Sequence, residues 1–122
     1  MTDLGLYIHI PFCRSRCAYC GFYSIGRKPD APFLKALAKE MEMRSPAFQD
    51  YLCDTIYLGG GTPSSLSENQ LAEVMDNIRR RFHISDHPEI TMKMNPCDIT
   101  ESYLRHPRAL GINRNSIRLQ TH

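Results

Sequence analysis

The chain has 122 residues, of which 42% are hydrophobic and 23% are charged, and its formal net charge is +2. This length suits one small domain or part of a larger one, and the composition argues against intrinsic disorder. The weak net charge gives no support to a nucleic-acid partner or to an anionic membrane surface. No apolar run approaches the ~20 residues of a transmembrane segment, and residues 1–10 lack the features of a targeting signal, so we expect a cytoplasmic protein.

The predicted elements alternate between strand and helix along the chain. Apolar and β-branched runs predict strands at residues 4–10, 55–58, 89–94 and 116–120. Apolar side chains at helical spacing predict helices at residues 31–44, from residue 67 to about residue 82, and at residues 100–106. Ser67 and Gln70 have the spacing of a capping box, which marks the start of the second helix.

This order, β-α-β-α-β-α-β, predicts an α/β fold with a parallel sheet and crossover helices. A closed βα barrel takes roughly 250 residues, about twice the length of this chain. We therefore expect residues 1–122 to be a truncated, N-terminal part of a barrel. A compact four-stranded domain is the alternative.

A cysteine cluster follows the first predicted strand. Cys13, Cys17 and Cys20 have the spacing Cys-x3-Cys-x2-Cys, and the total of five cysteines is odd, which excludes complete internal pairing. Clustered cysteines without a secretion signal favour metal ligands over disulfides. Three thiolates on a four-iron cluster leave one iron open to a small molecule, which predicts iron chemistry with a bound ligand.

Two other metal-binding classes remain open from the residues alone. The three thiolates could bind zinc, with His9 as the fourth ligand. A simple electron-transfer ferredoxin would need a fourth cysteine, and we interpret Cys53 and Cys97 as buried or incidental thiols. Colour separates the metals, because an iron–sulfur protein is brown.

The other distinctive motifs also follow predicted strands. Gly59, Gly60 and Gly61 follow the second strand, and Asn95 follows the third. Ligands of parallel α/β folds bind at the carboxyl ends of the strands, so these motifs predict one shared site. Strand alternation places one polar set on the side away from the helices: Tyr7, His9, Thr91, Lys93, Asn95, Ser116, Arg118 and Gln120.

These motifs together resemble a known family. The cysteine cluster, Gly-Gly-Gly-Thr-Pro at residues 59–63, Gly-Ile-Asn-Arg at residues 111–114 and Tyr-Ile-His-Ile-Pro-Phe-Cys at residues 7–13 are similar to the radical S-adenosylmethionine (SAM) proteins related to oxygen-independent coproporphyrinogen III oxidase. The resemblance covers residues 4–120. It implies the N-terminal part of a TIM-like partial barrel.

The resemblance also implies cofactors, partners and roles for matching residues. Cys13, Cys17 and Cys20 would hold a [4Fe-4S] cluster, and SAM would chelate the open iron. Reduction by an electron donor would then cleave SAM to methionine and a 5′-deoxyadenosyl radical. The further partner would be heme or a porphyrinogen. Matching positions would contact SAM at Tyr7, Tyr19, Gly60, Gly61, Thr62 and Gln120, with Lys93 at the position where the family has a glutamate.

Two branches of the family differ in features that the sequence shows. The oxidase branch has a further cysteine where this chain has Phe22, and it has an N-terminal extension before the position of Tyr7. Both features favour the heme-chaperone branch, which binds and transfers heme. The alternatives are the oxidase, which decarboxylates propionate side chains in heme biosynthesis, and an inactive fragment.

Several departures from the family pattern fall near the expected SAM pocket. Lys93 replaces the glutamate, and Arg118, Asn115 and His122 replace a glycine, an apolar residue and an aromatic residue. Two like charges at 4 Å and an effective dielectric constant of 20 repel by ~4 kcal/mol. We therefore expect Lys93 to weaken the binding of SAM, whose sulfonium is positively charged.

Overall fold

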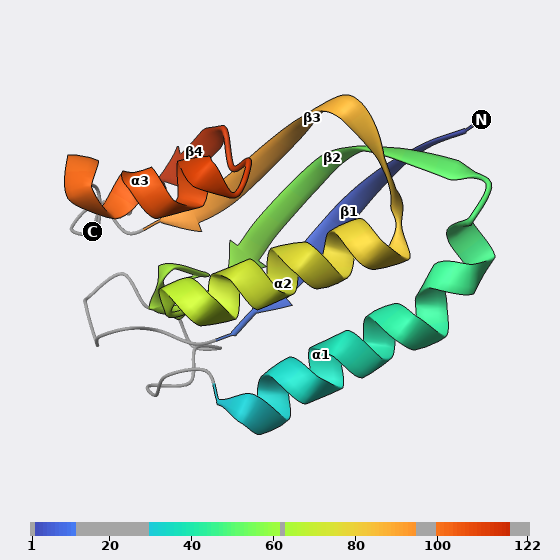
Figure 1. Ribbon diagram of the computed structural model, residues 1–122, viewed down its shortest axis with the longest axis horizontal. Helices are drawn as coiled ribbons and strands as arrows, with labels where there is room; N and C mark the ends of the chain where they lie inside the picture. The colour runs from blue at the N-terminus through green and yellow to red at the C-terminus, as the bar shows by residue number, and fades with distance from the viewer. Residues whose placement is uncertain (1, 12–29, 62, 95–99, 118–122) are drawn as a thin grey trace, which may run out of the picture.

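The four strands form one parallel sheet in the computed structural model, which describes residues 2–11, 30–61, 63–94 and 100–117 (Figure 1). The strand order is β1-β2-β3-β4, and every neighbouring pair is parallel. This confirms the predicted α/β class. The elements in chain order are β1 (Thr2–Ile10), α1 (Ala31–Arg44), a 3₁₀ turn (Ser45–Phe48), β2 (Tyr51–Gly60), a second 3₁₀ turn (Pro63–Ser65), α2 (Glu68–Arg81), β3 (His83–Met94), α3 (Glu101–Ala109) and β4 (Arg114–Ile117).

The hydrophobic core lies between the sheet and the helices, with α1 and α2 on the same side of the sheet in Figure 1. Alternate side chains of β1, β2 and β3 enter this core, as the polar and apolar alternation predicts. Full burial of one such side chain contributes roughly 1.5–3 kcal/mol. The buried strand residues are Ile8, Ile10, Cys53, Ile56, Leu58, Ile90, Met92 and Met94, and the helices add Leu34, Met41, Leu71, Val74, Met75, Ile78 and Leu104.

The second helix begins where the sequence predicts. The Gln70 backbone N–H donates to Ser67 Oγ at 3.1 Å, and the Ser67 N–H donates to Gln70 Oε1 at 2.8 Å. These two bonds form the predicted capping box and satisfy backbone donors that the helix leaves free. The first helix has the predicted bounds, and its N-cap Asp30 accepts a hydrogen bond from the Phe33 N–H at 3.1 Å.

The strands β2 and β3 begin earlier than the sequence indicates. The predicted start of β2 at residue 55 is wrong because the strand begins at Tyr51, and β3 begins at His83 in place of residue 89. The first part of β3 is polar and contains Pro88, so it lacks the apolar pattern of a strand. It pairs with β2 at Cys53 and Ile84, and after a register break the pairing resumes at Glu89.

The last two elements also differ from the predicted bounds. Helix α3 runs to Ala109 although Pro107 lies inside it. Its end is closed by the Leu110 N–H, which donates to the carbonyl oxygens of His106 and Pro107. Strand β4 begins at Arg114, two residues before the predicted start, and residues 118–120 of the predicted strand lie outside the described residues.

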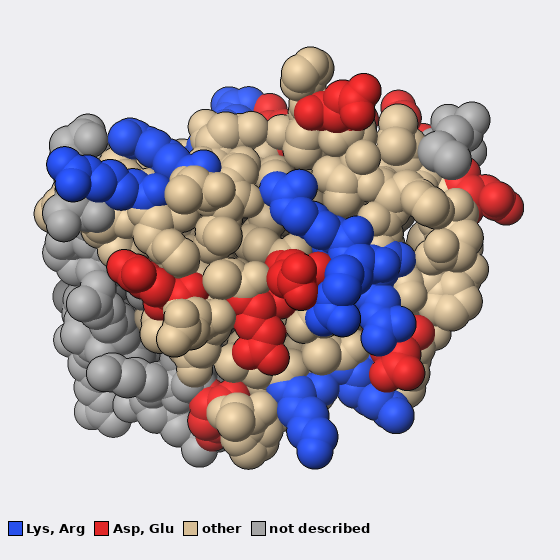
Figure 2. Space-filling view, in the orientation of Figure 1, with Lys and Arg blue, Asp and Glu red and all other residues tan. Residues whose placement is uncertain are grey.

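The helix-covered face carries mixed charges (Figure 2). Arg79, Arg80 and Arg81 lie in the last turn of α2. Their positive charges interact favourably with the negative end of the helix dipole. Arg80 also donates to Asp76 at 3.0 Å within the helix. Among the helices of the described residues, none is long and apolar enough to cross a membrane.

Candidate functional site

The carboxyl ends of β1 and β2 meet at one edge of the sheet. Ile10 is paired with Gly60 in the parallel register, and His9 is paired with Gly59. The Gly61 N–H then donates to the Ile10 carbonyl oxygen at 2.8 Å. This contact places the glycine motif directly beside the end of β1, as the shared-site prediction requires.

Position 60 requires glycine for reasons within the chain itself. Gly60 has φ +101°, a left-handed conformation that residues with a side chain rarely adopt. A Cβ atom there would lie 2.7 Å from the Ile10 carbonyl oxygen and 2.9 Å from His9 Nδ1. The glycine therefore lets the two strand ends approach each other closely, and it leaves the edge as bare backbone.

Lys93 binds this edge from the neighbouring strand. Its Nζ donates a hydrogen bond to the Gly60 carbonyl oxygen at 2.8 Å, and the side chain is partly buried. Within the described part of the chain, this is the one polar contact that Lys93 makes. The structure thus brings two residues that were predicted to contact SAM, Lys93 and Gly60, into direct contact with each other.

Tyr7 lies on the open face of the sheet, below this edge. Its side chain is 56% exposed, so it is not a core aromatic. Its ring stacks on Tyr57 with centroids 5.8 Å apart, and its hydroxyl lies 3.2 Å from His9 Nδ1. Partial burial, and secondarily the nearby Tyr57, raises the pKa of Tyr7.

Tyr57 also belongs to this face, and it was not among the residues predicted for the site. Its hydroxyl donates to Ser116 Oγ at 3.0 Å and thereby joins β2 to β4 across β3. A Cβ at Gly59 would lie 2.6 Å from the Tyr57 ring and 2.9 Å from the Tyr7 ring, so this glycine makes room for both rings. The alternation of Tyr57 with the buried Ile56 and Leu58 was the signal that could have identified it.

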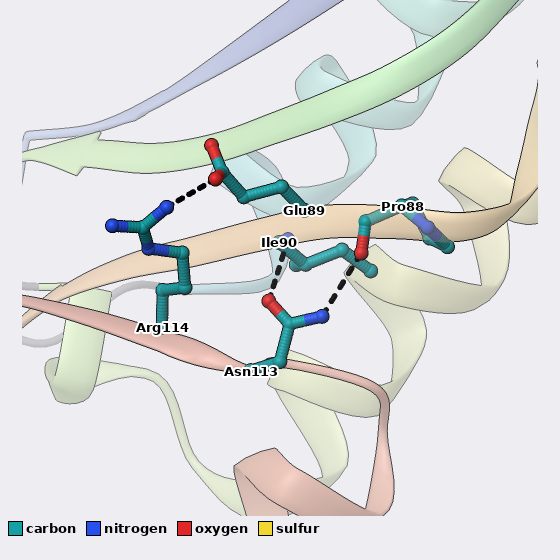
Figure 3. Close-up of polar contacts among 5 residues, drawn as sticks. All are labelled: Pro88, Glu89, Ile90, Asn113 and Arg114. Carbon is teal, nitrogen blue, oxygen red and sulfur yellow. Dashed lines mark hydrogen bonds and ion pairs between the residues drawn. The ribbon is translucent and has the colours of Figure 1, made fainter.

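The start of β4 and the residue before it are held against β3 by polar contacts (Figure 3). The Asn113 side chain accepts from the Ile90 N–H at 3.0 Å and donates to the Pro88 carbonyl oxygen at 2.9 Å. Arg114 forms an ion pair with Glu89 on the open face. The motif at residues 111–114 therefore has a structural role, which is to set the register of β4.

Several predicted site residues lie outside the described residues, namely Cys13, Cys17, Cys20, Tyr19, Phe22, Thr62, Asn95, Cys97, Arg118, Gln120 and His122. Among the residues that the structure describes, no group of three His, Cys, Asp or Glu side chains could hold a metal ion. Of the predicted SAM contacts, Tyr7, Gly60, Gly61 and Lys93 are described, and all four lie at or next to the same edge.

Cys53 is a buried thiol at the other end of β2, as the sequence analysis expected. Its Sγ donates to the Thr55 carbonyl oxygen at 3.4 Å. Burial is the main cause that raises the pKa of this thiol. A protonated, enclosed thiol is a poor metal ligand.

Comparisons with known proteins agree with this arrangement. The family model of the radical SAM superfamily matches residues 7–122. The heme chaperone HemW of Buchnera aphidicola subsp. Schizaphis graminum is 36% identical over 99% of this chain and 33% of its own length. The HemW of Bacillus subtilis is 42% identical over 94% of this chain and 31% of its own length. The oxygen-independent coproporphyrinogen III oxidase of Salmonella typhimurium is 38% identical over 96% of this chain and 26% of its own length.

A solved structure has the same fold. The coproporphyrinogen III oxidase HemN from Escherichia coli, described as a radical SAM enzyme, superposes with a TM-score of 0.87 at 34% sequence identity, over 98% of this chain and 28% of its own length. The parallel sheet with alternating helices thus corresponds to part of the partial TIM-like barrel of HemN. The chain spans about a quarter to a third of the length of the relatives it matches. This chain belongs to the radical SAM superfamily.

Proposed function

We propose that this chain is the cluster- and SAM-binding part of a heme chaperone-type protein. The observation that carries the proposal is the meeting of Gly60, Gly61 and Lys93 at one carboxyl edge, with Tyr7 on the open face next to it. Residues 12–29, which contain the three cysteines, come soon after the carboxyl end of β1 in the chain. In this proposal, Cys13, Cys17 and Cys20 hold a [4Fe-4S] cluster.

The described residues offer polar groups to a bound SAM and oppose it in charge. Gly61 has no side chain at this edge, and the open face offers the hydroxyl of Tyr7 and the imidazole of His9. The ammonium of Lys93 lies at the same edge and repels a positive ligand. When bound, the cluster and SAM supply radical chemistry, and the chain's own residues bind and orient them.

The choice between chaperone and oxidase rests on residues that differ between the branches. Relatives with both names occur at similar identity, 36% and 42% for HemW and 38% for the oxidase. Phe22 occupies the position of the extra oxidase cysteine. This difference favours heme binding and transfer. Oxidative decarboxylation of a porphyrinogen is the second candidate function.

Two assays on the same anaerobic, cluster-reconstituted sample test this proposal. Titration with heme should produce a shifted Soret band that saturates at one heme per chain. Incubation of the sample with SAM, dithionite and coproporphyrinogen III should yield no vinyl product. Formation of that product would identify the oxidase. Absence of both signals would contradict both functions and support an inactive fragment.

A variant pair tests the proposed cluster ligands. Cys17→Ala removes a proposed cluster ligand, and Cys53→Ala removes the buried thiol of the core. We expect loss of the cluster absorbance in the first variant and its retention in the second. Equal loss in both variants would show that the cluster depends on folding and not on the proposed ligands.

A further inference from the structure

We propose that Lys93 selects the charge of the adenosyl ligand, so that this chain binds the uncharged thioether S-adenosylhomocysteine more tightly than the sulfonium SAM. The inference rests on the proposed function, because it takes the ligand to lie at the Gly60 edge. It assigns Lys93 to that site as a specificity-determining residue and says which of the two ligands the site prefers.

The ammonium group of Lys93 already occupies a backbone acceptor at this edge. Lys93 Nζ lies 2.8 Å from the Gly60 carbonyl oxygen, which is an acceptor on the bare edge between β1 and β2. A ligand amino group that needs this acceptor finds an ammonium already there. A ligand must therefore displace the Lys93 contact or bind beside a fixed positive charge.

No carboxylate of the described residues compensates the charge of Lys93. The carboxylate on the same face of β3 is Glu89, and it forms its ion pair with Arg114. Among the ion pairs of the described residues, none includes Lys93. Its side chain is partly buried, and a charge in such a place is less screened than one in bulk water. Among the described residues, the edge therefore carries a positive charge that no carboxylate pairs with.

SAM and S-adenosylhomocysteine differ in net charge. SAM has a positive sulfonium, a positive ammonium and a negative carboxylate, for a net charge of +1. S-adenosylhomocysteine has the same adenosyl and amino acid groups without the sulfonium charge. At roughly 10 Å and an effective dielectric constant near 20, a repelled unit charge lowers affinity by about tenfold. A comparison of these two ligands therefore separates the effect of the sulfonium charge from recognition of the adenosyl and amino acid groups.

The test is anaerobic calorimetry of the cluster-reconstituted chain with each of the two ligands. We expect the wild type to bind S-adenosylhomocysteine about tenfold more tightly than SAM. Lys93→Met keeps most of the side-chain volume without the charge, and it should abolish the preference. Lys93→Glu should reverse it. Lys39→Met removes an exposed lysine of α1 and should leave the wild-type ratio unchanged.

The affinity ratio distinguishes this inference from the proposed function. A ratio that is the same in the wild type, Lys93→Met and Lys93→Glu overturns the role of Lys93 while SAM binding stands. Lack of binding of both ligands to every variant overturns the proposed function and the inference with it. Thermal unfolding of each variant before titration shows that it is folded, and Lys93→Gln replaces Lys93→Met if the latter does not fold.

Discussion

The Tyr57 hydroxyl donates a hydrogen bond to Ser116 Oγ at 3.0 Å, across the intervening strand β3. The two residues are 59 positions apart in the chain, so the bond links the second and fourth strands of the sheet. Together with the Lys93 contact to Gly60, it holds the open face in a fixed register.

Removal of this hydroxyl should weaken the sheet without disturbing its aromatic stack. Tyr57→Phe keeps the ring against Tyr7 and removes the donor to Ser116, so we expect a loss of about 1 kcal/mol in the free energy of unfolding. Urea denaturation measures the change. Tyr51→Phe is the matched control, because the Tyr51 ring contacts Phe48 by its edge and its hydroxyl makes no hydrogen bond to a described residue. Equal losses in both variants would contradict the role of the Ser116 bond.

The glycine at position 60 should tolerate no side chain. Gly60→Ala places a Cβ 2.7 Å from the Ile10 carbonyl oxygen at a positive φ, so we expect a loss of about 2 kcal/mol or more. Thermal unfolding provides the measurement. In Gly5→Ala, the new Cβ would lie 3.0 Å from Thr55 Oγ1, on an exposed side chain, and the loss should be clearly smaller. A neutral Gly60→Ala would show that the edge can rearrange.

Loss of the Asn113 side chain should loosen β4. Asn113→Ala leaves the Ile90 N–H without its acceptor and frees the Pro88 carbonyl oxygen, which costs roughly 1–3 kcal/mol. Hydrogen exchange at the Ile90 amide should accelerate in the same variant. The control is Asn115→Ala, which changes an exposed neighbour in the same strand. Unchanged exchange at Ile90 in Asn113→Ala would refute this account of the register.

The buried Cys53 thiol should make the free energy of unfolding decrease as the pH becomes alkaline. Burial raises its pKa above the ordinary value of 9.0, so the unfolded chain loses this proton first as pH rises. The stabilisation is present below about pH 9 and decreases as pH rises toward the folded-state pKa. We therefore expect the free energy of unfolding of the wild type to fall relative to Cys53→Ala between pH 8 and pH 10. A pH-independent difference between the two proteins would contradict the shift.

Local patterns in the sequence predicted the elements that depend on neighbouring residues. The bounds of α1, the capping box at Ser67 and Gln70, and the buried alternation of β3 all follow from side chains within a few positions of one another. The early starts of β2 and β3 did not follow, because these short segments become strands by pairing with neighbouring strands: the start of β2 with β1, and the start of β3 with β2.

The site contacts depended on information that a single sequence lacks. The sequence placed Lys93 and Gly60 at strand ends, and it gave no register for strands 33 residues apart. Their hydrogen bond exists because β2 and β3 pair with Leu58 opposite Met92, which brings the next residues of β3 level with the glycines. The same register brings Tyr57 within reach of Ser116.

The most direct test of the central claim is the metal content of the purified chain and its response to SAM. After anaerobic reconstitution, we expect about four irons and four sulfides per chain, because three cysteines can anchor a four-iron cluster with one open iron. The electron paramagnetic resonance spectrum of the reduced cluster should change when SAM is added. A colourless protein that retains zinc, or a reduced cluster whose spectrum is the same with and without SAM, would contradict the account.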